Sequence, residues 1–220
     1  MIQAVSNNSS RIALVTGSLV LGGSTTFLCN LGGELIRRGA ACRVFGDIGE
    51  NTLAADFHSC GLPITQPQGR HAIFEDRLEV TLQALREFQP AVVIASLMPF
   101  AYETLRYLPP GIQRIAMAQS DDPNVYAHLE KYADHMDVVA GVSAAILSKL
   151  ESMPAFSRVE KTLQHYGVAM PEQTAARAKP GEPLRILYLG RLEQEQKRVR
   201  LFPKILAILR DSGMPFHWTI

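Results

Sequence analysis

Short apolar runs alternate along the chain with longer amphipathic stretches, and this alternation is the feature that most restricts its fold. The clearest strand candidates, residues 11–16 (RIALVT) and 91–95 (AVVIA), are apolar at almost every position. Strands of that kind are buried on both faces, as in parallel sheets that helices cover on both sides. Residues 25–38 and 73–88 instead repeat large apolar residues at helical spacing. The sequence therefore predicts an α/β domain with a doubly wound parallel sheet.

The remaining elements follow the same alternation. Further strands are expected at residue 64 and at residues 42–45, 112–117 and 138–142, and further helices at 51–60, 101–108, 123–133 and 144–150. Asp122 stands directly before Pro123, and Ser143 directly before the last of these helices. Both are residue types that cap helix N-termini, and proline suits a first helical turn.

The pattern is interrupted once, which predicts two domains. Residues 1–170 form the first domain, and residues 171–183, which hold three prolines and one glycine, form a linker. The pattern restarts in residues 184–220 with a strand at 184–189, a helix at 200–210 and a strand at 215–220. One β-α-β unit is too small for an independent domain, so we expect the second domain to be truncated.

Composition excludes several classes of protein. Hydrophobic residues make up 47% of the chain, charged residues 20%, and the net charge is +1, as in a soluble globular protein without affinity for nucleic acid. The three cysteines have no CxxC spacing and no close partner in sequence, which favours reduced thiols over a metal site. Neither a signal peptide nor a membrane span is predicted. We expect a cytoplasmic protein, and peripheral contact with a membrane surface stays open.

Two loops between a strand and a helix carry candidate anion-binding residues. In residues 17–24 (GSLVLGGS), Gly22 and Gly23 precede a helix whose N-terminus favours a diphosphate. The spacing fits neither the nicotinamide nor the P-loop fingerprint, and a tight turn is the alternative. In residues 190–197, Arg191 and Lys197 are cations suited to neutralising a departing nucleoside diphosphate. The alternative there is a solvated charged loop, because two glutamates lie between them.

A third candidate site follows the strand at 112–117. Gln119, Ser120 and Asp121 are polar residues at a strand end, where they are placed to contact hydroxyls of a sugar or an acceptor, and the carboxylates at 121 and 122 could instead bind a metal. Adjacent carboxylates point in different directions, so Asp121 and Asp122 are not predicted to act as an acid/base pair. Helix capping is the alternative role, and it is favoured for Asp122.

Four segments together resemble glycosyltransferase family 4, whose members are retaining enzymes of the GT-B fold. The first is residues 20–25 (VLGGST) with a helix that ends in LIRRG, which resembles the family's glycine loop and first helix. The others are VVAGVS at 138–143, YGV at 166–168 followed by Pro171, and LYLGRL at 187–192 followed by Gln196 and Lys197. Their order and spacing match the family over residues 11–220.

The resemblance implies two Rossmann-like domains that face each other across a cleft. In such enzymes the second domain binds a nucleoside diphosphate sugar and the first mostly binds the acceptor, a glycan or a lipid-linked molecule. Arg191 and Lys197 would contact the donor diphosphate, and Gly22 and Gly23 would close over the same phosphates. Neither a metal nor another cofactor is implied. Loops near residues 46–51 and 97–102 are expected to select the acceptor.

The sequence also departs from the family. Gln119 stands where a related branch has a histidine before Ser-Asp-Asp, so it supplies no acid or base. Tyr166 stands where asparagine is commoner, and the family's later E-x₇-E element has no counterpart before residue 220. We therefore expect this chain alone to be inactive and assign no catalytic residue. A non-catalytic sugar- or protein-binding module is the alternative, and a sugar-nucleotide epimerase of similar form is a third hypothesis.

Overall fold

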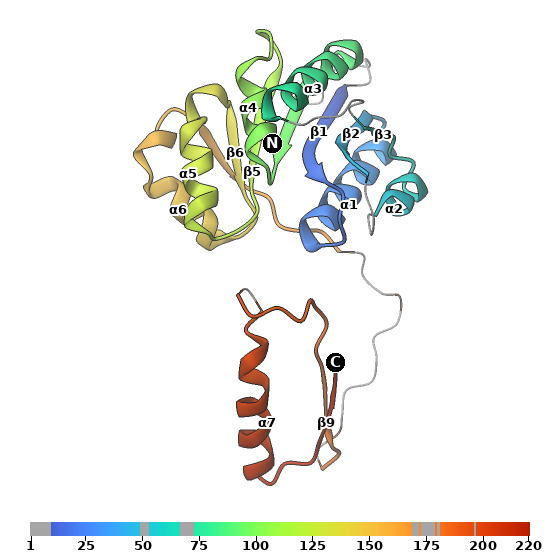
Figure 1. Cartoon of the computed structure of the whole chain (residues 1–220), viewed down its shortest axis with the longest axis vertical. Helices are drawn as coiled ribbons and strands as arrows, with labels where there is room; N and C mark the ends of the chain where they lie inside the picture. Colours follow the sequence, from blue (N-terminus) through green and yellow to red (C-terminus); the bar gives the residue numbers. More distant parts are fainter. Residues whose placement is uncertain are drawn as a thin grey trace. The chain divides into compact units, whose positions relative to one another are not determined.

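The computed structural model describes residues 10–48, 53–66, 73–168, 172, 179, 181–195 and 197–220. The chain divides into two compact units, Met1–Val168 and Ala169–Ile220 (Figure 1). Most of the predicted linker, residues 171–183, lies outside the described residues, and so does Gln196.

The first unit is built on a seven-stranded parallel sheet in the order β3-β2-β1-β4-β5-β6-β7. Each neighbouring pair is parallel, and the register places Leu14 of β1 between Val44 of β2 and Ile94 of β4. The strands are β1 (Arg11–Ser18), β2 (Ala41–Asp47), β3 (Ile64–Thr65), β4 (Val92–Ser96), β5 (Gln113–Ala118), β6 (Val138–Gly141) and β7 (Glu160–Leu163). This confirms the predicted doubly wound α/β class.

Helices cover both faces of the sheet (Figure 1). They are α1 (Gly23–Arg37), α2 (Ala54–Ser59), α3 (Phe74–Phe88), α4 (Pro99–Arg106), α5 (Pro123–Lys131) and α6 (Ala144–Ser152), with short 3-10 turns at Ala133–His135 and Pro154–Phe156. Leu14 packs in the cluster that includes α1 and α2, whereas its neighbours Ala13 and Val15 pack in the cluster that includes α3 to α6. Alternate residues of one strand thus serve both cores, which explains why the strands are apolar throughout.

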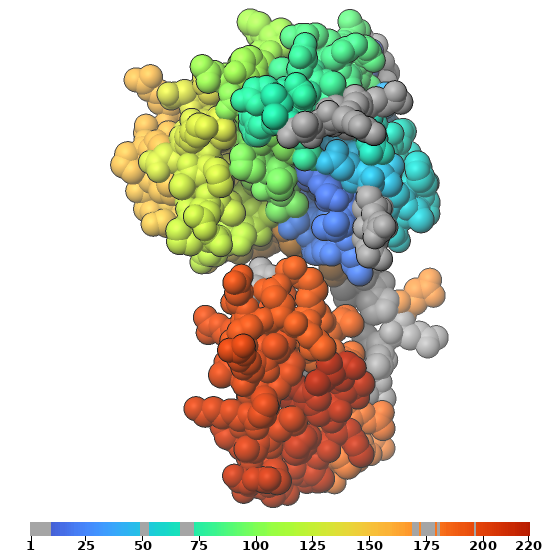
Figure 2. Space-filling model, viewed as in Figure 1, coloured from blue at the N-terminus to red at the C-terminus, as the bar shows by residue number. Residues whose placement is uncertain are grey.

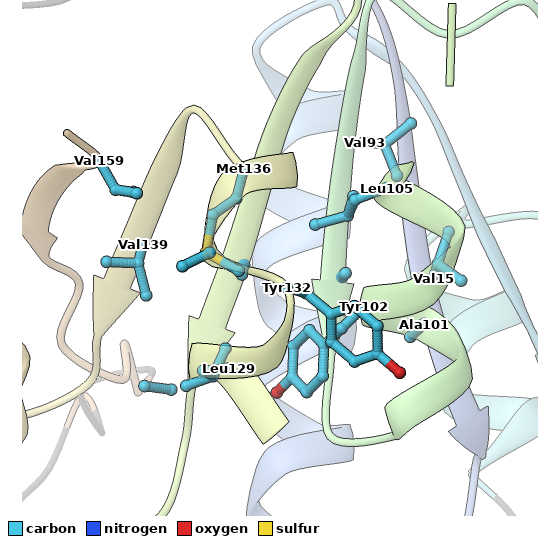
Figure 3. Packing of buried hydrophobic residues seen from close by; sticks show 14 of the residues in the cluster. Val15, Val93, Ala101, Tyr102, Leu105, Leu129, Tyr132, Met136, Val139 and Val159 are labelled. Atoms are coloured by element: carbon cyan, nitrogen blue, oxygen red, sulfur yellow. The ribbon is translucent and has the colours of Figure 1, made fainter. Parts of the chain in front are cut away.

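The larger core lies between the sheet and α4, α5 and α6. Figure 3 shows Val15, Val93 and Val139 on their strands beside Leu105 of α4 and Leu129 of α5, all of them buried. Figure 2 shows one face of the first unit, much of which is made of the green to yellow segments that include α3, α4 and α5. This core holds the strand ends, and therefore the loops that follow them, in fixed positions.

Three details differ from the sequence predictions. No strand was predicted at β7, whose residues EKTL include only one apolar residue and are largely exposed because β7 is the edge strand of the sheet. Helix α4 begins at Pro99, two residues before the expected start, with proline in its first turn. A contact between two cysteines was not predicted either: the Sγ atoms of Cys29 and Cys60 are 3.3 Å apart, because the end of α2 packs on α1.

The second unit contains one parallel β-α-β arrangement. Strands β8 (Leu184–Leu187) and β9 (Phe216–Thr219) pair side by side, and α7 (Phe202–Asp211), preceded by a 3-10 turn at Val199–Leu201, connects them. Rings of Tyr188, Phe202 and Trp218 pack against one another, with centroids 4.7 Å and 5.3 Å apart. In the described parts of both units, every helix is too short or too polar to cross a bilayer.

Candidate functional site

The sheet order locates the crevice in which an α/β domain of this type binds ligands. From β1 the chain passes to α1 on one face of the sheet, whereas from the adjacent β4 it passes to α4 on the other face. The loops after these two strands therefore diverge and leave a crevice at the carboxyl edge of the sheet. Residues 19–22 after β1 and residues 97–98 after β4 line this point.

The loop before α1 presents bare backbone at a helix N-terminus. Gly22 is the N-cap residue in an extended conformation (φ 175°, ψ 161°), and no side chain caps the helix. A Cβ atom added at Gly22 or at Gly23 would meet no atom within 4 Å, so open space lies beside both residues. The first turn carries no acidic residue. Its free N–H groups and the positive end of the helix dipole suit an anion such as a phosphate.

The loop after β4 is strained and held by a buried tyrosine. Leu97 adopts a left-handed conformation (φ 69°) that leucine rarely takes. Its N–H donates to the hydroxyl of Tyr102 at 3.2 Å, and that hydroxyl donates to the carbonyl of Met117 on β5 at 2.8 Å. Burial raises the pKa of Tyr102, so its hydroxyl stays a donor. Strain of this kind collects at functional sites, and no pattern in the sequence indicates it.

Gln119 lies beside this loop at the end of β5. Its Oε1 accepts a hydrogen bond from Ser96, the last residue of β4, which is fully buried. Its Nε2 is buried and has no hydrogen-bond partner among the residues that the structure describes. An unsatisfied buried amide is costly, and a ligand hydroxyl or a water molecule would relieve that cost. Of the three predicted acceptor-side residues, Gln119 is the one with a buried side-chain polar atom that no described residue satisfies.

The side chains of Asp121 and Asp122 each accept a hydrogen bond within the first unit. The hydroxyl of Tyr126 on α5 donates to Asp121 Oδ1 at 2.8 Å, and burial together with this carboxylate raises the pKa of Tyr126. Asp122 caps α5 by accepting from the N–H of Asn124 at 2.8 Å, which confirms the capping prediction. Ser143 caps α6 in the same way through Ile146. Ser120 lies between Gln119 and Asp121 and is half-buried.

The segment after β7 returns to α1. The ring of Tyr166 stacks on Phe27 with centroids 4.6 Å apart, and its hydroxyl lies 3.5 Å from that of Ser24. Asn30 Nδ2 donates to the carbonyl of Gly167 at 3.2 Å. Tyr166 is thus anchored beside the first turns of the helix that the glycine loop precedes. Tyr166 stands at the position where asparagine is commoner in the family that the sequence resembles, and its aromatic ring makes the contact with Phe27.

In the second unit, the predicted cations lie in the loop between β8 and the turn before α7. Arg191 is largely exposed and pairs with Glu193 at 3.2 Å, while its carbonyl accepts a hydrogen bond from Tyr188 at 2.5 Å. Lys197 is exposed, and no described acidic group lies within ion-pair distance of it. Arg198 follows in a left-handed conformation (φ 52°) that turns the chain toward α7. Each cation therefore has its charge at the protein surface.

Comparison with known proteins extends this description of the fold. No protein-family model matches the sequence, and no curated protein matches it. Solved structures do match. The lipopolysaccharide outer core galactosyltransferase WaaB has 18% identity and a TM-score of 0.63 over 94% of this chain and 67% of its own. A glycosyltransferase from Rickettsia africae has 14% identity and a TM-score of 0.66 over 96% and 60%.

A UDP-N-acetylglucosamine 2-epimerase also matches, with 11% identity and a TM-score of 0.57 over 96% of this chain and 63% of its own. The fold is of the GT-B type. At these identities the likeness concerns the fold and no more. The chain spans about 60% to 67% of the length of these GT-B proteins. The glycine loop and Gln119 thus lie in the Rossmann-like domain of a GT-B fold.

Proposed function

We propose that this chain is part of a retaining glycosyltransferase, which moves a sugar from a nucleoside diphosphate sugar to a glycan or a lipid-linked acceptor. The observation that carries the proposal is the uncapped glycine loop at the crevice of a GT-B domain. Gly22 and Gly23 leave the backbone N–H groups of α1 accessible, and the first turn has no acidic residue to compete with a phosphate. The names of the galactosyltransferase and of the epimerase that share the fold support sugar chemistry with a nucleotide donor.

Charge neutralisation of the leaving diphosphate falls to protein cations in this proposal. A glycosyl transfer leaves a nucleoside diphosphate with additional negative charge, which fixed positive groups stabilise. Arg191 offers a planar fork for two phosphate oxygens and Lys197 a point charge. Arg191 would exchange its ion pair with Glu193 for the diphosphate, since an exposed pair of this kind contributes about 0–1 kcal/mol. No metal ion or other cofactor is required for this role.

The acceptor would bind at the polar group beside the strained loop. Gln119 has a buried amide nitrogen ready to donate to a hydroxyl, with Ser120 and Asp121 next to it. An amide orients a hydroxyl without exchanging its proton, so Gln119 is proposed to position the acceptor or the transferred sugar. We place the enzyme in the cytoplasm, with peripheral membrane contact where the acceptor is lipid-linked.

Calorimetric titration with UDP, GDP and ADP tests the donor part of the proposal. We expect one of the three nucleotides to bind this chain, and we expect Arg191→Ala and Lys197→Ala each to weaken that binding about tenfold, because each removes a charge-assisted contact. Absence of any change in these variants would show that both cations are ordinary surface charges.

Matched control variants are available in the same unit. Arg210→Ala removes an exposed arginine that is likewise paired with an adjacent acid, Asp211, and Lys204→Ala removes an exposed lysine of α7. Neither lies in the β8–α7 loop, so neither should change nucleotide affinity by more than the general effect of one positive charge. Equal losses in test and control variants would contradict a specific diphosphate site.

Epimerisation of a nucleotide sugar is the second candidate, because a 2-epimerase shares the fold at a TM-score of 0.57. The four motifs that resemble a transferase family favour transfer. Product analysis separates the two: a transferase releases nucleoside diphosphate only with an acceptor or by slow hydrolysis, whereas an epimerase returns an isomeric nucleotide sugar. Nucleotide binding with neither product would indicate a binding module.

A further inference from the structure

Two cysteines distant in sequence meet on the face of the sheet covered by α1 and α2. Cys29 lies in the middle of α1 and is 4% exposed, whereas Cys60 follows the last residue of α2 and is exposed. Their Sγ atoms are 3.3 Å apart. A disulfide needs about 2.05 Å between the sulfurs. The two atoms are therefore already within about 1.3 Å of bonding distance.

The backbone around the pair explains how the sulfurs come so close. Gly33 lies one helical turn after Cys29, on the same side of α1. A Cβ atom added at Gly33 would lie 3.2 Å from the Cβ of Cys60, tighter than ordinary packing. The absence of a side chain at Gly33 therefore lets Cys60 reach the surface of α1. At Gly32, an added Cβ would come within 2.4 Å of Leu62, so the whole turn after α2 rests on a glycine surface of α1.

We propose that Cys29 and Cys60 form a redox-active dithiol, a site for reversible thiol–disulfide exchange. The oxidant is a small-molecule disulfide such as oxidised glutathione. The exposed Cys60 thiolate attacks one sulfur of this reagent, which forms a mixed disulfide on Cys60 and releases one glutathione thiolate. The sulfur of Cys29, after losing its proton to solvent, then attacks Cys60 and expels the second glutathione. The protein gives up two electrons and two protons, and one glutathione disulfide becomes two thiols.

Burial assigns the two cysteines different parts in this exchange. Loss of hydration and the neighbouring Cys60 raise the pKa of Cys29 to about 12, so Cys29 is almost always protonated and reacts slowly with reagents in solution. Its rare thiolate suffices for the second step, because the mixed disulfide on Cys60 is held directly beside it. Cys60 is exposed and meets those reagents first. The third cysteine, Cys42 on β2, is buried at 4% exposure and lies outside this pair. A reagent in solution therefore reacts first with Cys60, and Cys29 then displaces it from the mixed disulfide on Cys60. Cys42 takes no part in either step.

Oxidation would join two elements of the first unit. The bond would link α1, whose N-terminus carries Gly22 and Gly23, to the turn after α2 across 31 positions of sequence. Closing a loop of that length restricts the unfolded chain and stabilises the folded one. The oxidised protein should therefore unfold at a higher temperature than the reduced protein. This inference does not depend on the proposed glycosyl transfer.

The test treats the folded full chain with oxidised glutathione, blocks remaining thiols after unfolding, and maps the peptides by mass spectrometry. We expect two of the three thiols to be lost, a cross-linked peptide pair containing Cys29 and Cys60, and full recovery with dithiothreitol. Cys42→Ser is the matched control and should give the same cross-link. Cys29→Ser should stop at a persistent glutathione adduct on Cys60, and Cys60→Ser should leave Cys29 unmodified.

A second measurement needs no variant. Phenylarsine oxide binds tightly only where two thiols reach one arsenic atom, so the native chain should bind one equivalent and lose two free thiols. The proposal is overturned if the wild-type chain accumulates a persistent adduct on Cys60 with no cross-link, as Cys29→Ser does, or if the arsenical leaves all thiols free. A cross-link between two chains instead of within one would overturn it as well.

Discussion

Replacing Gly22 by aspartate would separate what the glycine loop does for the fold from what it does for a ligand. Gly22 is the N-cap residue of α1, and its φ of 175° is an extended conformation that every residue adopts. A Cβ atom added at this position would meet no atom within 4 Å. Gly22→Asp is therefore free of steric cost, and it introduces a preferred N-cap residue where no side chain caps the helix.

For stability, the substitution should be favourable. An aspartate cap in place of glycine contributes a few tenths of a kcal/mol, and its charge at the positive end of the helix dipole about 0.3–1 kcal/mol. Restriction of the unfolded chain adds about 0.4–1 kcal/mol, because glycine has more conformational freedom to lose. A gain of about 1–2.4 kcal/mol follows, or about 2–10 °C in Tm for a domain of this size.

For diphosphate binding, the same substitution should be harmful. A carboxylate about 5 Å from a phosphate is repelled by about 1 kcal/mol in water and by about 3 kcal/mol at the effective dielectric of a protein surface. Affinity for the nucleotide should therefore fall between about 5-fold and about 150-fold. Gly22→Asn is the matched control, because asparagine caps the helix equally well without the charge.

Thermal unfolding and calorimetric titration with UDP measure the two effects on the same samples. We expect Gly22→Asp to be more stable than the native chain and to bind the nucleotide more weakly than Gly22→Asn does. Equal nucleotide affinity in the aspartate and asparagine variants would refute the placement of an anion at this loop. Lower stability in both variants would refute the structural argument, because it would show that the N-cap position needs glycine.

Three further predictions concern stability. Asp122→Ala should cost about 1 kcal/mol in urea unfolding, because it removes the 2.8 Å bond to Asn124 N, while Asp122→Asn should keep most of that energy. Tyr102→Phe removes the hydroxyl shared by Leu97 and Met117, so a loss of about 1–3 kcal/mol is expected, and a loss under about 0.5 kcal/mol would contradict that bridging role. Burial raises the pKa of Cys42 from 9.0 to about 12, so its thiol stabilises the fold below pH 9 and that contribution fades as pH rises toward 12. The free energy of unfolding, measured by urea unfolding between pH 8 and pH 11, should accordingly fall less steeply with pH for Cys42→Ala than for the native chain.

Elements whose signal is local in the sequence were predictable. The buried strands were visible as continuous apolar runs, and the caps Asp122 and Ser143 as short polar residues before helices. Strand β7 was missed because an edge strand needs no apolar pattern, and its residues EKTL are largely exposed. The sequence thus predicts a strand when the side chains of that strand are buried and apolar. It gives no signal for an edge strand that pairs with its neighbour but keeps its side chains exposed.

Contacts between distant residues had no sequence signal at all. Cys29 and Cys60 meet because Gly32 and Gly33 flatten one side of α1, and nothing in the spacing of the cysteines indicates this. The left-handed Leu97 and the unsatisfied amide of Gln119 likewise depend on how β4 and β5 end side by side. Sequence patterns identify Gln119 as a candidate residue. That its amide is unsatisfied, and that Leu97 is strained, becomes visible only in the packed structure.

The two candidate anion sites differ in how the fold supports them, and this difference orders the experiments. The loop before α1 is fixed by a 15-residue helix packed on a seven-stranded sheet, and its donors are backbone groups that no substitution of a side chain removes. The loop with Arg191 and Lys197 relies on two exposed side chains, each of which gives up conformational freedom on binding. Changes at Gly22 should therefore act through charge and geometry, whereas changes at the cations act by removing the group itself.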